Sequence, residues 1–222
     1  MHVLVSDTSV LVDLERGSFL QAVFALPFDL AVPDLLFRRE LQAEIGERLV
    51  QFGLKVLELD AAGVTLALSY RQRDSRLSLP DTFALALAKT HTYILLTGDA
   101  SLRGLAQAEE VECHGVLWIL DQMLSQEAAS PADLHAGLLA IAKHPRCRLP
   151  KHEIASRLDA YMSKKKKRLK SNLRQLNPLC PEPDTAKAQV SGSPTVRRHL
   201  LDTRRRLFNG NRDTLRKNSL RS

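Results

Sequence analysis

HVLVSDTSVL, residues 2–11, places a short apolar strand directly before a helix. Residues 2–6 are apolar and β-branched, which is typical of a strand buried inside a sheet. Asp7, Thr8 and Ser9 then offer side chains that can cap a helix, and Gly17 marks where that helix ends. A strand that leads at once into a helix is the repeating unit of an α/β fold.

The alternation of strand and helix patterns continues to about residue 125. Further strands are predicted at residues 28–32, 54–59, 93–96 and 111–114. Between them, helices are predicted from Pro33 to Gly53 and at residues 61–73, 79–90, 100–107 and 116–124. The sequence therefore predicts an α/β, three-layer fold with a mostly parallel central sheet flanked by helices.

After residue 125 the strand patterns end, and two predicted helices are followed by a segment of different composition. Ser130 and Pro131 open a predicted helix that runs to about His144, and a second is predicted from about residue 150 to 170. Beyond residue 177, turn-forming residues are frequent and large apolar residues are few, so we expect a largely disordered tail. The predicted organisation is an α/β domain at 1–125, additional helices packed on or extending it at 126–176, and a basic, largely disordered tail at 177–222.

Charge divides the chain unevenly. Residues 1–150 hold 13 basic and 19 acidic residues, for a net charge of −6, whereas residues 151–222 hold 19 basic and 6 acidic residues, for +13. A basic end of this kind favours a polyanionic partner such as RNA, although a solvated tail that only aids solubility is the alternative. The clearest candidate RNA contacts are Lys164, Lys165, Lys166, Lys167 and Arg168.

Cysteine usage and hydropathy indicate the compartment. The three cysteines are odd in number and show no metal-ligand spacing, so we expect no disulfide framework and a cytoplasmic location. Asp7 interrupts the first apolar run, which argues against a signal peptide. No run of 18 apolar residues occurs, so we expect no membrane span.

Four acidic residues stand where an active site of such a fold would form. Asp7 ends the first predicted strand and Asp99 follows the fourth, while Glu40 and Asp81 lie on helices that can border the same cleft. Converging carboxylates repel one another unless a hard cation such as Mg²⁺ or Mn²⁺ lies between them. Taken singly, each residue has an ordinary explanation as a helix cap, a surface acid or a turn residue.

The order of the four motifs resembles the PIN-domain family, and within it the VapC-like toxins of bacterial toxin–antitoxin pairs. The motifs are DTSVL at 7–11, VPDLLFRREL at 32–41, LPDTFALALAK at 79–89 and ILLTGDASL at 94–102. The resemblance covers roughly residues 1–125 and implies an endoribonuclease that depends on Mg²⁺ or Mn²⁺. A metal-activated water would hydrolyse the RNA phosphodiester.

The resemblance also implies a role for each site residue. Asp7, Asp81 and Asp99 would hold the metal directly, and Glu40 would bind it through water or act as base. Ser9 and Thr97 would help to orient water or phosphate, or would only bond the local backbone. Many relatives carry another acid where Ser101 stands here, which puts a second metal site in doubt. A small antitoxin protein and a homodimer are the partners that the family leads one to expect.

Two other functions fit the same residues. A non-catalytic PIN-fold module that binds nucleic acid or protein, and a housekeeping nuclease for RNA or DNA, both remain open. The sequence has no Gly-rich phosphate loop, and the second Asp of haloacid-dehalogenase-like phosphatases is replaced by Ser9. His91, His114, His135 and His144 lack ligand spacing, and Trp118 in VLWIL is expected in the core rather than as a base-stacking platform.

Overall fold

The computed structural model describes residues 2–176, and the side chains of residues 2–166. Its centre is a five-stranded sheet in the order β3-β2-β1-β4-β5, and every pairing is parallel. The predicted α/β class with a mostly parallel sheet is therefore confirmed. The strands are β1 (His2–Ser6), β2 (Phe28–Pro33), β3 (Lys55–Leu57), β4 (Ile94–Leu96) and β5 (Cys113–His114).

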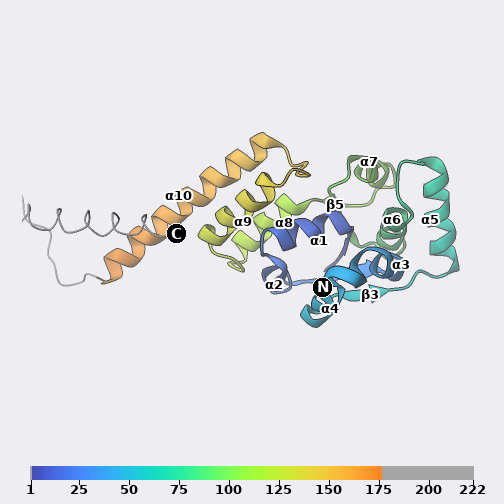
Figure 1. Ribbon diagram of the computed structural model, residues 1–222, viewed down its shortest axis with the longest axis horizontal. Coiled ribbons are helices and arrows are strands. Elements are labelled where there is room, and N and C mark those ends of the chain that lie inside the picture. Colours follow the sequence, from blue (N-terminus) through green and yellow to red (C-terminus); the bar gives the residue numbers. More distant parts are fainter. Residues whose placement is uncertain (1, 177–222) are drawn as a thin grey trace, which may run out of the picture. The chain divides into compact units, whose positions relative to one another are not determined.

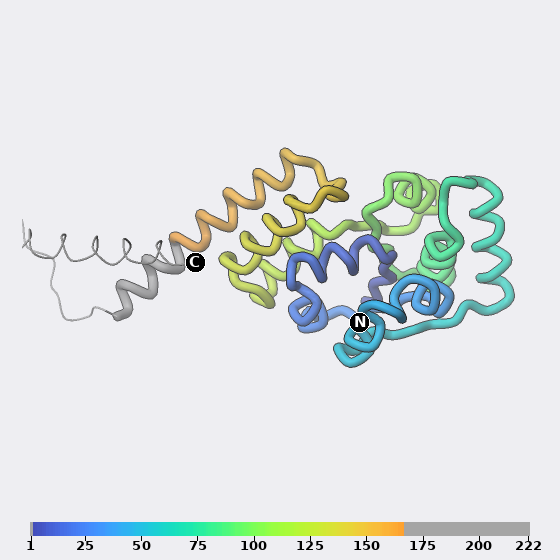
Figure 2. The backbone as a smooth tube through the Cα atoms, in the orientation of Figure 1, coloured from blue at the N-terminus to red at the C-terminus, as the bar shows by residue number. Residues whose placement is uncertain are grey.

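Helices form the outer layers of the molecule. Figure 1 shows α1 (Thr8–Arg16), α8 (Val116–Ser125) and α9 (Pro131–Lys143) gathered on one side and α5 (Ala61–Arg73) and α6 (Leu79–His91) on the other. The remaining helices are α2 (Leu20–Val23), α3 (Asp34–Leu36), η1 (Phe37–Gly46), α4 (Glu47–Phe52), α7 (Ala100–Ala108) and α10 (Lys151–Leu176). The chain path in Figure 2 shows how strands and helices alternate from blue through green.

The structure departs from the predicted elements in several places, and the fifth strand covers only Cys113–His114 of the predicted residues 111–114. The single long helix expected between Pro33 and Gly53 is divided, and its middle part, η1, is a π-helix. The third strand is three residues long instead of six, because β3 pairs with β2 only over Lys55–Leu57. The short helix α2 was not predicted, since four residues are too few to show a helical period.

The two helices after residue 125 take part in the main core. Leu134, Leu138 and Ile141 of α9 are fully buried, and Tyr161 of α10 is 1 % exposed. Strand β1 and helix α1 contribute to the same cluster of buried apolar side chains. The described residues 2–176 lie in one compact unit, so α9 and α10 belong to the body that carries the sheet.

No helix in the described part of the chain is long and apolar enough to cross a membrane. The predicted tail at 177–222 lies outside the described residues.

Candidate active site at the carboxyl edge of the sheet

The candidate site lies where the strand order reverses. From β1 the chain adds β2 and β3 on one side, and it then returns to place β4 and β5 on the other side. Ser6 at the end of β1 is paired with Leu96 at the end of β4, so Asp7 and Thr97 emerge side by side. In open parallel sheets, the crevice at such a reversal is where ligands bind.

Asp7 is held at this edge by a set of donors. Its side chain is the N-cap of α1, where Oδ1 accepts a hydrogen bond from the Val10 backbone N–H at 3.0 Å and from Ser9 Oγ at 2.8 Å. The other oxygen, Oδ2, accepts a short hydrogen bond from Thr97 Oγ1. The residue is only 2 % exposed. Asp7 is thus fixed in place rather than free to turn toward solvent.

Burial raises the pKa of Asp7 from 3.8 to about 6. The hydrogen bonds from Thr97, Val10 and Ser9 lower this pKa but only partly offset the loss of solvent. The negative charge of Asp81 raises it further, which places the Asp81 carboxylate within electrostatic range of Asp7. A strongly shifted carboxyl group beside another carboxylate, at the ligand-binding edge of a sheet, is typical of a functional site.

Asp81 and Asp99 each use one carboxylate oxygen locally. Asp81 is the third residue of α6, and its Oδ2 accepts hydrogen bonds from the Ser78 backbone N–H at 3.2 Å and from Ser78 Oγ at 2.6 Å. Asp99 is the N-cap of α7, and its Oδ1 accepts from the Leu102 backbone N–H at 2.9 Å. Within residues 2–166, no donor bonds Asp81 Oδ1 or Asp99 Oδ2. One oxygen of each carboxylate therefore remains available to another ligand.

Two hydroxyl groups connect the strand ends. Thr97 Oγ1 bonds Asp7 and also accepts from the Asp99 backbone N–H at 2.9 Å. Ser9 Oγ bonds Asp7 and accepts from the Gly98 backbone N–H at 3.2 Å. A Cβ on Gly98 would lie 3.0 Å from Ser9 Oγ, so glycine permits this close approach. Ser9 and Thr97 thus bind both a carboxylate and the backbone.

Glu40 reaches the same edge from the π-helix η1. Its Oε2 accepts a short hydrogen bond from Thr8 Oγ1, and Thr8 directly follows Asp7. Glu40 is exposed, whereas Asp7 is buried. Glu40 is therefore tied to the first turn of α1. The sequence indicates Thr8 only as a possible helix cap, because only the fold shows that Glu40 lies beside it.

Asp7 and Asp81 lie within electrostatic range, and Glu40 and Asp99 lie beside α1 and β4, but the four carboxylates do not form a ready-made metal centre. Among the described residues, no group of three or more His, Cys, Asp and Glu side chains is arranged so that it could hold a metal ion. The donor chemistry nevertheless fits Mg²⁺ or Mn²⁺, since these ions prefer carboxylate oxygens and retain several waters. A metal would use the free oxygens of Asp81 and Asp99, in part through water.

Two arginines, Arg76 and Arg103, lie near the acids, and the sequence alone does not predict their place there. The charge of Asp99 stabilises the Arg76 guanidinium, whose main partner is Asp74 at 2.7 Å. Arg103 donates from Nη2 to the Thr97 carbonyl oxygen at 2.9 Å. No spacing rule in the sequence links these arginines to the four acids, so their position depends on the tertiary fold.

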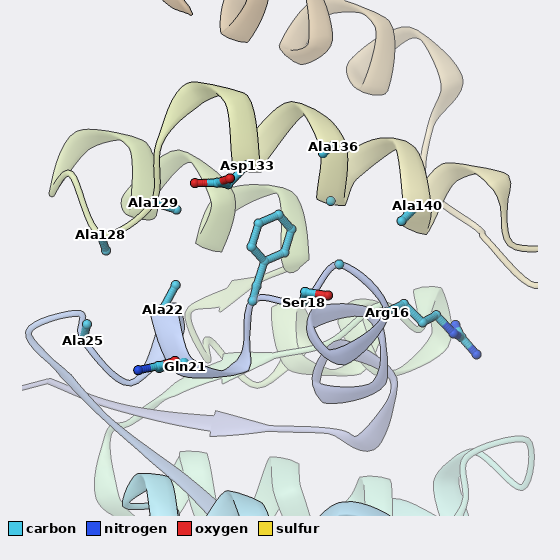
Figure 3. Close-up of a pocket in the computed structure, with 13 residues that line it drawn as sticks. Arg16, Ser18, Gln21, Ala22, Ala25, Ala128, Ala129, Asp133, Ala136 and Ala140 are labelled. Carbon is cyan, nitrogen blue, oxygen red and sulfur yellow. The ribbon is translucent and has the colours of Figure 1, made fainter. Parts of the chain in front are cut away.

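A separate hollow of ≈ 580 Å³ lies between helix α9 and the α1–α2 segment. Figure 3 shows Asp133, Ala136 and Ala140 on one wall and Ala22, Ala25, Gln21 and Ser18 on the other. None of the four predicted acids lines it. The chemistry expected from the sequence therefore belongs to the carboxyl edge and not to this alanine-lined hollow.

Fold and site together define an α/β protein with acidic side chains at the switch point of a parallel sheet. Residues 3–162 match the family DUF3368: PIN domain, and the chain belongs to this family. PIN domains are generally nucleases. The family match includes α9 and part of α10, whereas the motifs recognised in the sequence end near residue 102.

Two solved structures are similar to parts of this chain. A PilT N-terminus domain protein from the hyperthermophilic archaeon Sulfolobus solfataricus has a TM-score of 0.39 and 12 % identity, covering 56 % of this chain and 94 % of its own. A toxin–antitoxin complex from Klebsiella pneumoniae has a TM-score of 0.31 and 23 % identity, covering 43 % of this chain and 86 % of its own. No curated protein matches the sequence.

Proposed function

We propose that the protein is a metal-dependent endoribonuclease that hydrolyses single-stranded RNA at the carboxyl edge of its sheet. The observation that carries this proposal is the placement of Asp7 and Thr97 at the switch point between β1 and β4, with Asp81 close enough to raise the pKa of Asp7. Membership of a family whose members are generally nucleases supports the same conclusion.

Asp81 and Asp99 would bind Mg²⁺ or Mn²⁺ through the oxygens that no described donor occupies. Asp7 would contribute charge from its buried position, where Ser9 and Thr97 hold it. The bound ion would activate water and neutralise charge on the phosphoryl oxygens. Glu40 would accept a proton from water near Thr8, since it is exposed and within reach of this edge.

Asp81→Asn is the variant that tests this proposal. It removes a charge while keeping the size of the side chain, and we expect RNA cleavage to fall by at least about 100-fold, as for loss of one group that stabilises the transition state electrostatically. Cleavage of an RNA pool is measured with Mg²⁺, with Mn²⁺ and with chelator. Equal cleavage by both proteins that resists chelator would reject the assigned site.

Asp133→Asn is the matched control. Ser130 caps α9, and its Oγ donates to Asp133 Oδ2 at 2.6 Å, which repeats the pairing of Ser78 with Asp81 at the start of α6. Both substitutions weaken a similar helix cap, so both should change stability by a similar amount. Only Asp81→Asn should abolish cleavage. A DNA of matching sequence in the same assay separates an RNA-specific enzyme from a general nuclease.

We further propose that this nuclease acts as the toxin of a toxin–antitoxin pair. The proposal rests on the four ordered motifs and on family membership. Expression of wild-type protein in a bacterial host should arrest growth, whereas Asp81→Asn should not, and a small protein encoded beside the gene should relieve the arrest. Normal growth at full expression of an active nuclease would favour a housekeeping role. A homodimer, the other expected partner, is tested by mass measurement in solution.

A further inference from the structure

A second hollow adjoins the candidate active site. It has a volume of ≈ 350 Å³, and its wall includes Gly98 and Ala100, which flank Asp99. His114, Trp118 and Arg148 are among its other lining residues. This volume is at the small end of ligand pockets, of about 300–1,000 Å³, so it suits one nucleotide better than a protein helix.

One wall of this hollow is aromatic. The rings of His114 and Trp118 are stacked, with 4.2 Å between centroids and 4° between planes. His114 is also held by Glu112, which lies 2.9 Å from its Nε2. Trp118 was expected in the core, but it is partly exposed and packs against the core from outside. Trp118 also packs against Phe28, with 5.8 Å between ring centroids, so the exposed part of this ordered ring pair is the surface on which a nucleobase can stack.

The charge of the hollow is positive once its ion pairs are taken into account. Asp13 pairs with Arg16 at 2.9 Å, and Glu153 pairs with Arg157 at 3.1 Å. Within residues 2–166, neither Arg103 nor Arg148 forms an ion pair with a carboxylate, although both line the hollow and are exposed. Two unneutralised guanidinium groups beside an acidic edge are suited to bind phosphate.

Arg103 connects this hollow to the carboxylates. Its Nη2 donates to the Thr97 carbonyl oxygen, and the Thr97 hydroxyl bonds Asp7. A Cβ on Gly115 would lie 3.2 Å from the same Nη2 atom, so glycine leaves the space that the guanidinium occupies. A phosphate bound at Arg103 would therefore be next to the strand ends that carry Asp7 and Asp99.

We propose that this hollow holds one nucleotide of single-stranded RNA next to the bond that is cleaved. Its base stacks on the His114–Trp118 pair, and its phosphate lies between Arg103 and Arg148. The inference rests on the proposed nuclease function and adds to it a position for the substrate. It also gives a use to the loop between α9 and α10, which supplies Arg148.

The test measures RNA binding without cleavage. A short single-stranded RNA with a 5′-fluorescein label is titrated with the full chain in chelator, and binding is followed by fluorescence anisotropy. Trp118 is the only tryptophan in the chain, so its own fluorescence reports on the hollow even though the basic end also attracts RNA. Unlabelled RNA should quench Trp118 with the same midpoint that anisotropy gives.

Arg148→Ala is compared with Arg146→Ala. Both remove one exposed arginine from the same loop, but only Arg148 lines the hollow. Arg148→Ala should weaken binding about tenfold and lower the slope of log K against log salt by about 0.7, the value for one phosphate contact on a single strand. Arg146→Ala should bind like wild type. Equal effects of the two variants would overturn the proposal.

Trp118→Leu tests the stacking surface. It should weaken binding by about 5- to 150-fold, the range for loss of one base stack, and Trp118→Phe should restore most of the affinity. Circular dichroism checks that both variants are folded. Absence of Trp118 quenching by bound RNA, or wild-type affinity of folded Trp118→Leu, would refute the subsite.

Failure of the subsite and failure of the nuclease function give different results. If Asp81→Asn abolishes cleavage while Arg148→Ala binds RNA like wild type, the nuclease function is supported and the nucleotide subsite is rejected. If wild type does not cleave RNA but the Arg148 and Arg146 variants differ in RNA affinity as expected, the hollow binds RNA and the proposed nuclease activity is rejected.

Discussion

Asp7 accepts three hydrogen bonds, yet its burial at 2 % exposure still raises its pKa to about 6. A carboxylate that served only as the N-cap of α1 would not need to be buried beside another acid. In the metal-free protein its ionisation opposes folding, because the charge loses solvent and faces Asp81. A bound cation would reduce this unfavourable free energy of ionising Asp7.

We expect Asp7→Asn to stabilise the metal-free protein at pH 7.5. The pKa of Asp7 is raised from 3.8 to about 6 on folding, so between these two pH values the folded protein keeps a proton that the unfolded protein has lost. The free energy of unfolding should therefore fall as pH rises from about 4 to about 6, by up to about 3 kcal/mol, and stay low above it. The neutral amide removes this loss.

Urea unfolding in chelator at pH 4.5 and pH 7.5 measures the effect. The difference in unfolding free energy between the two pH values should be smaller for Asp7→Asn than for wild type. The same pH dependence in both proteins would show that Asp7 is not the group responsible.

At the scale of elements, the π-helix η1 sets where Glu40 points. The sequence pattern predicts one α-helix here, because apolar residues recur at steps of four. The wider winding of a π-helix shifts the side chains, and such segments are frequent at functional sites. Glu40 thereby contacts Thr8 of α1, whereas Glu44 of the same element makes no side-chain bond among the described residues.

Glu40→Gln should lower the rate of RNA cleavage by about 100- to 10,000-fold if Glu40 transfers a proton from water. Glu44→Gln is the matched control, since it changes an exposed acid of the same helix and should keep the wild-type rate. Single-turnover rates with saturating Mg²⁺ measure both. A Glu40→Gln enzyme as fast as the control would remove Glu40 from the chemistry.

The packing of α9 against the first helices depends on Gly137. A Cβ at this position would lie 2.5 Å from the Gly17 carbonyl oxygen and would overlap the Phe19 ring. Gly104 of α7 is the contrasting case, because a Cβ there has nothing within 4 Å. Both glycines lie inside helices, so they differ only in their surroundings.

Gly137→Ala should reduce the free energy of unfolding by about 1–3 kcal/mol through overpacking. Gly104→Ala should increase it by about 0.5–1 kcal/mol, because alanine favours the helix and meets no obstacle. Chemical denaturation of the two variants beside wild type measures this. A loss of stability in Gly104→Ala, or none in Gly137→Ala, would contradict the close packing of α9 on the α1–α2 segment.

At the scale of the whole molecule, an acidic body is joined to a basic end. Residues 1–150 carry a net charge of −6, which repels RNA from the site unless basic groups compensate. Lys164, Lys165 and Lys166 are exposed on α10, so they can contact phosphate without reading sequence.

Replacing Lys164, Lys165 and Lys166 together by Ala should weaken RNA binding at low salt and lower the salt slope by up to about 2, or about 0.7 for each phosphate that is no longer neutralised. Quenching of Trp118 at saturating RNA should persist, because these lysines are not part of the hollow. Anisotropy at several salt concentrations measures the slope. A slope equal to that of wild type would assign these lysines to solubility alone.

The strand-to-helix alternation made the α/β class predictable from sequence. Each unit carries its own signals, such as the apolar β-branched residues in β1 and the capping residues before α1, and the structure places these elements at or near the expected bounds. The π-helix and the short β3 escaped prediction, because both depend on packing and pairing with distant segments rather than on local residue type.

The ordered acidic motifs were also visible in the sequence by themselves, because each lies at a strand end or in the first turns of a helix. Only the tertiary structure decided that Thr8 would donate a hydrogen bond to Glu40 and that the charge of Asp81 would raise the pKa of Asp7. The tertiary structure alone also decided that Arg103, His114 and Trp118 would line one hollow beside the acidic edge. Hydrogen bonding and burial at these sites join residues up to 90 positions apart, as between Asp7 and Thr97. The local periodicity of the sequence carries no information about which distant residues come into contact, since these contacts are set by how the parallel strands are ordered in the sheet.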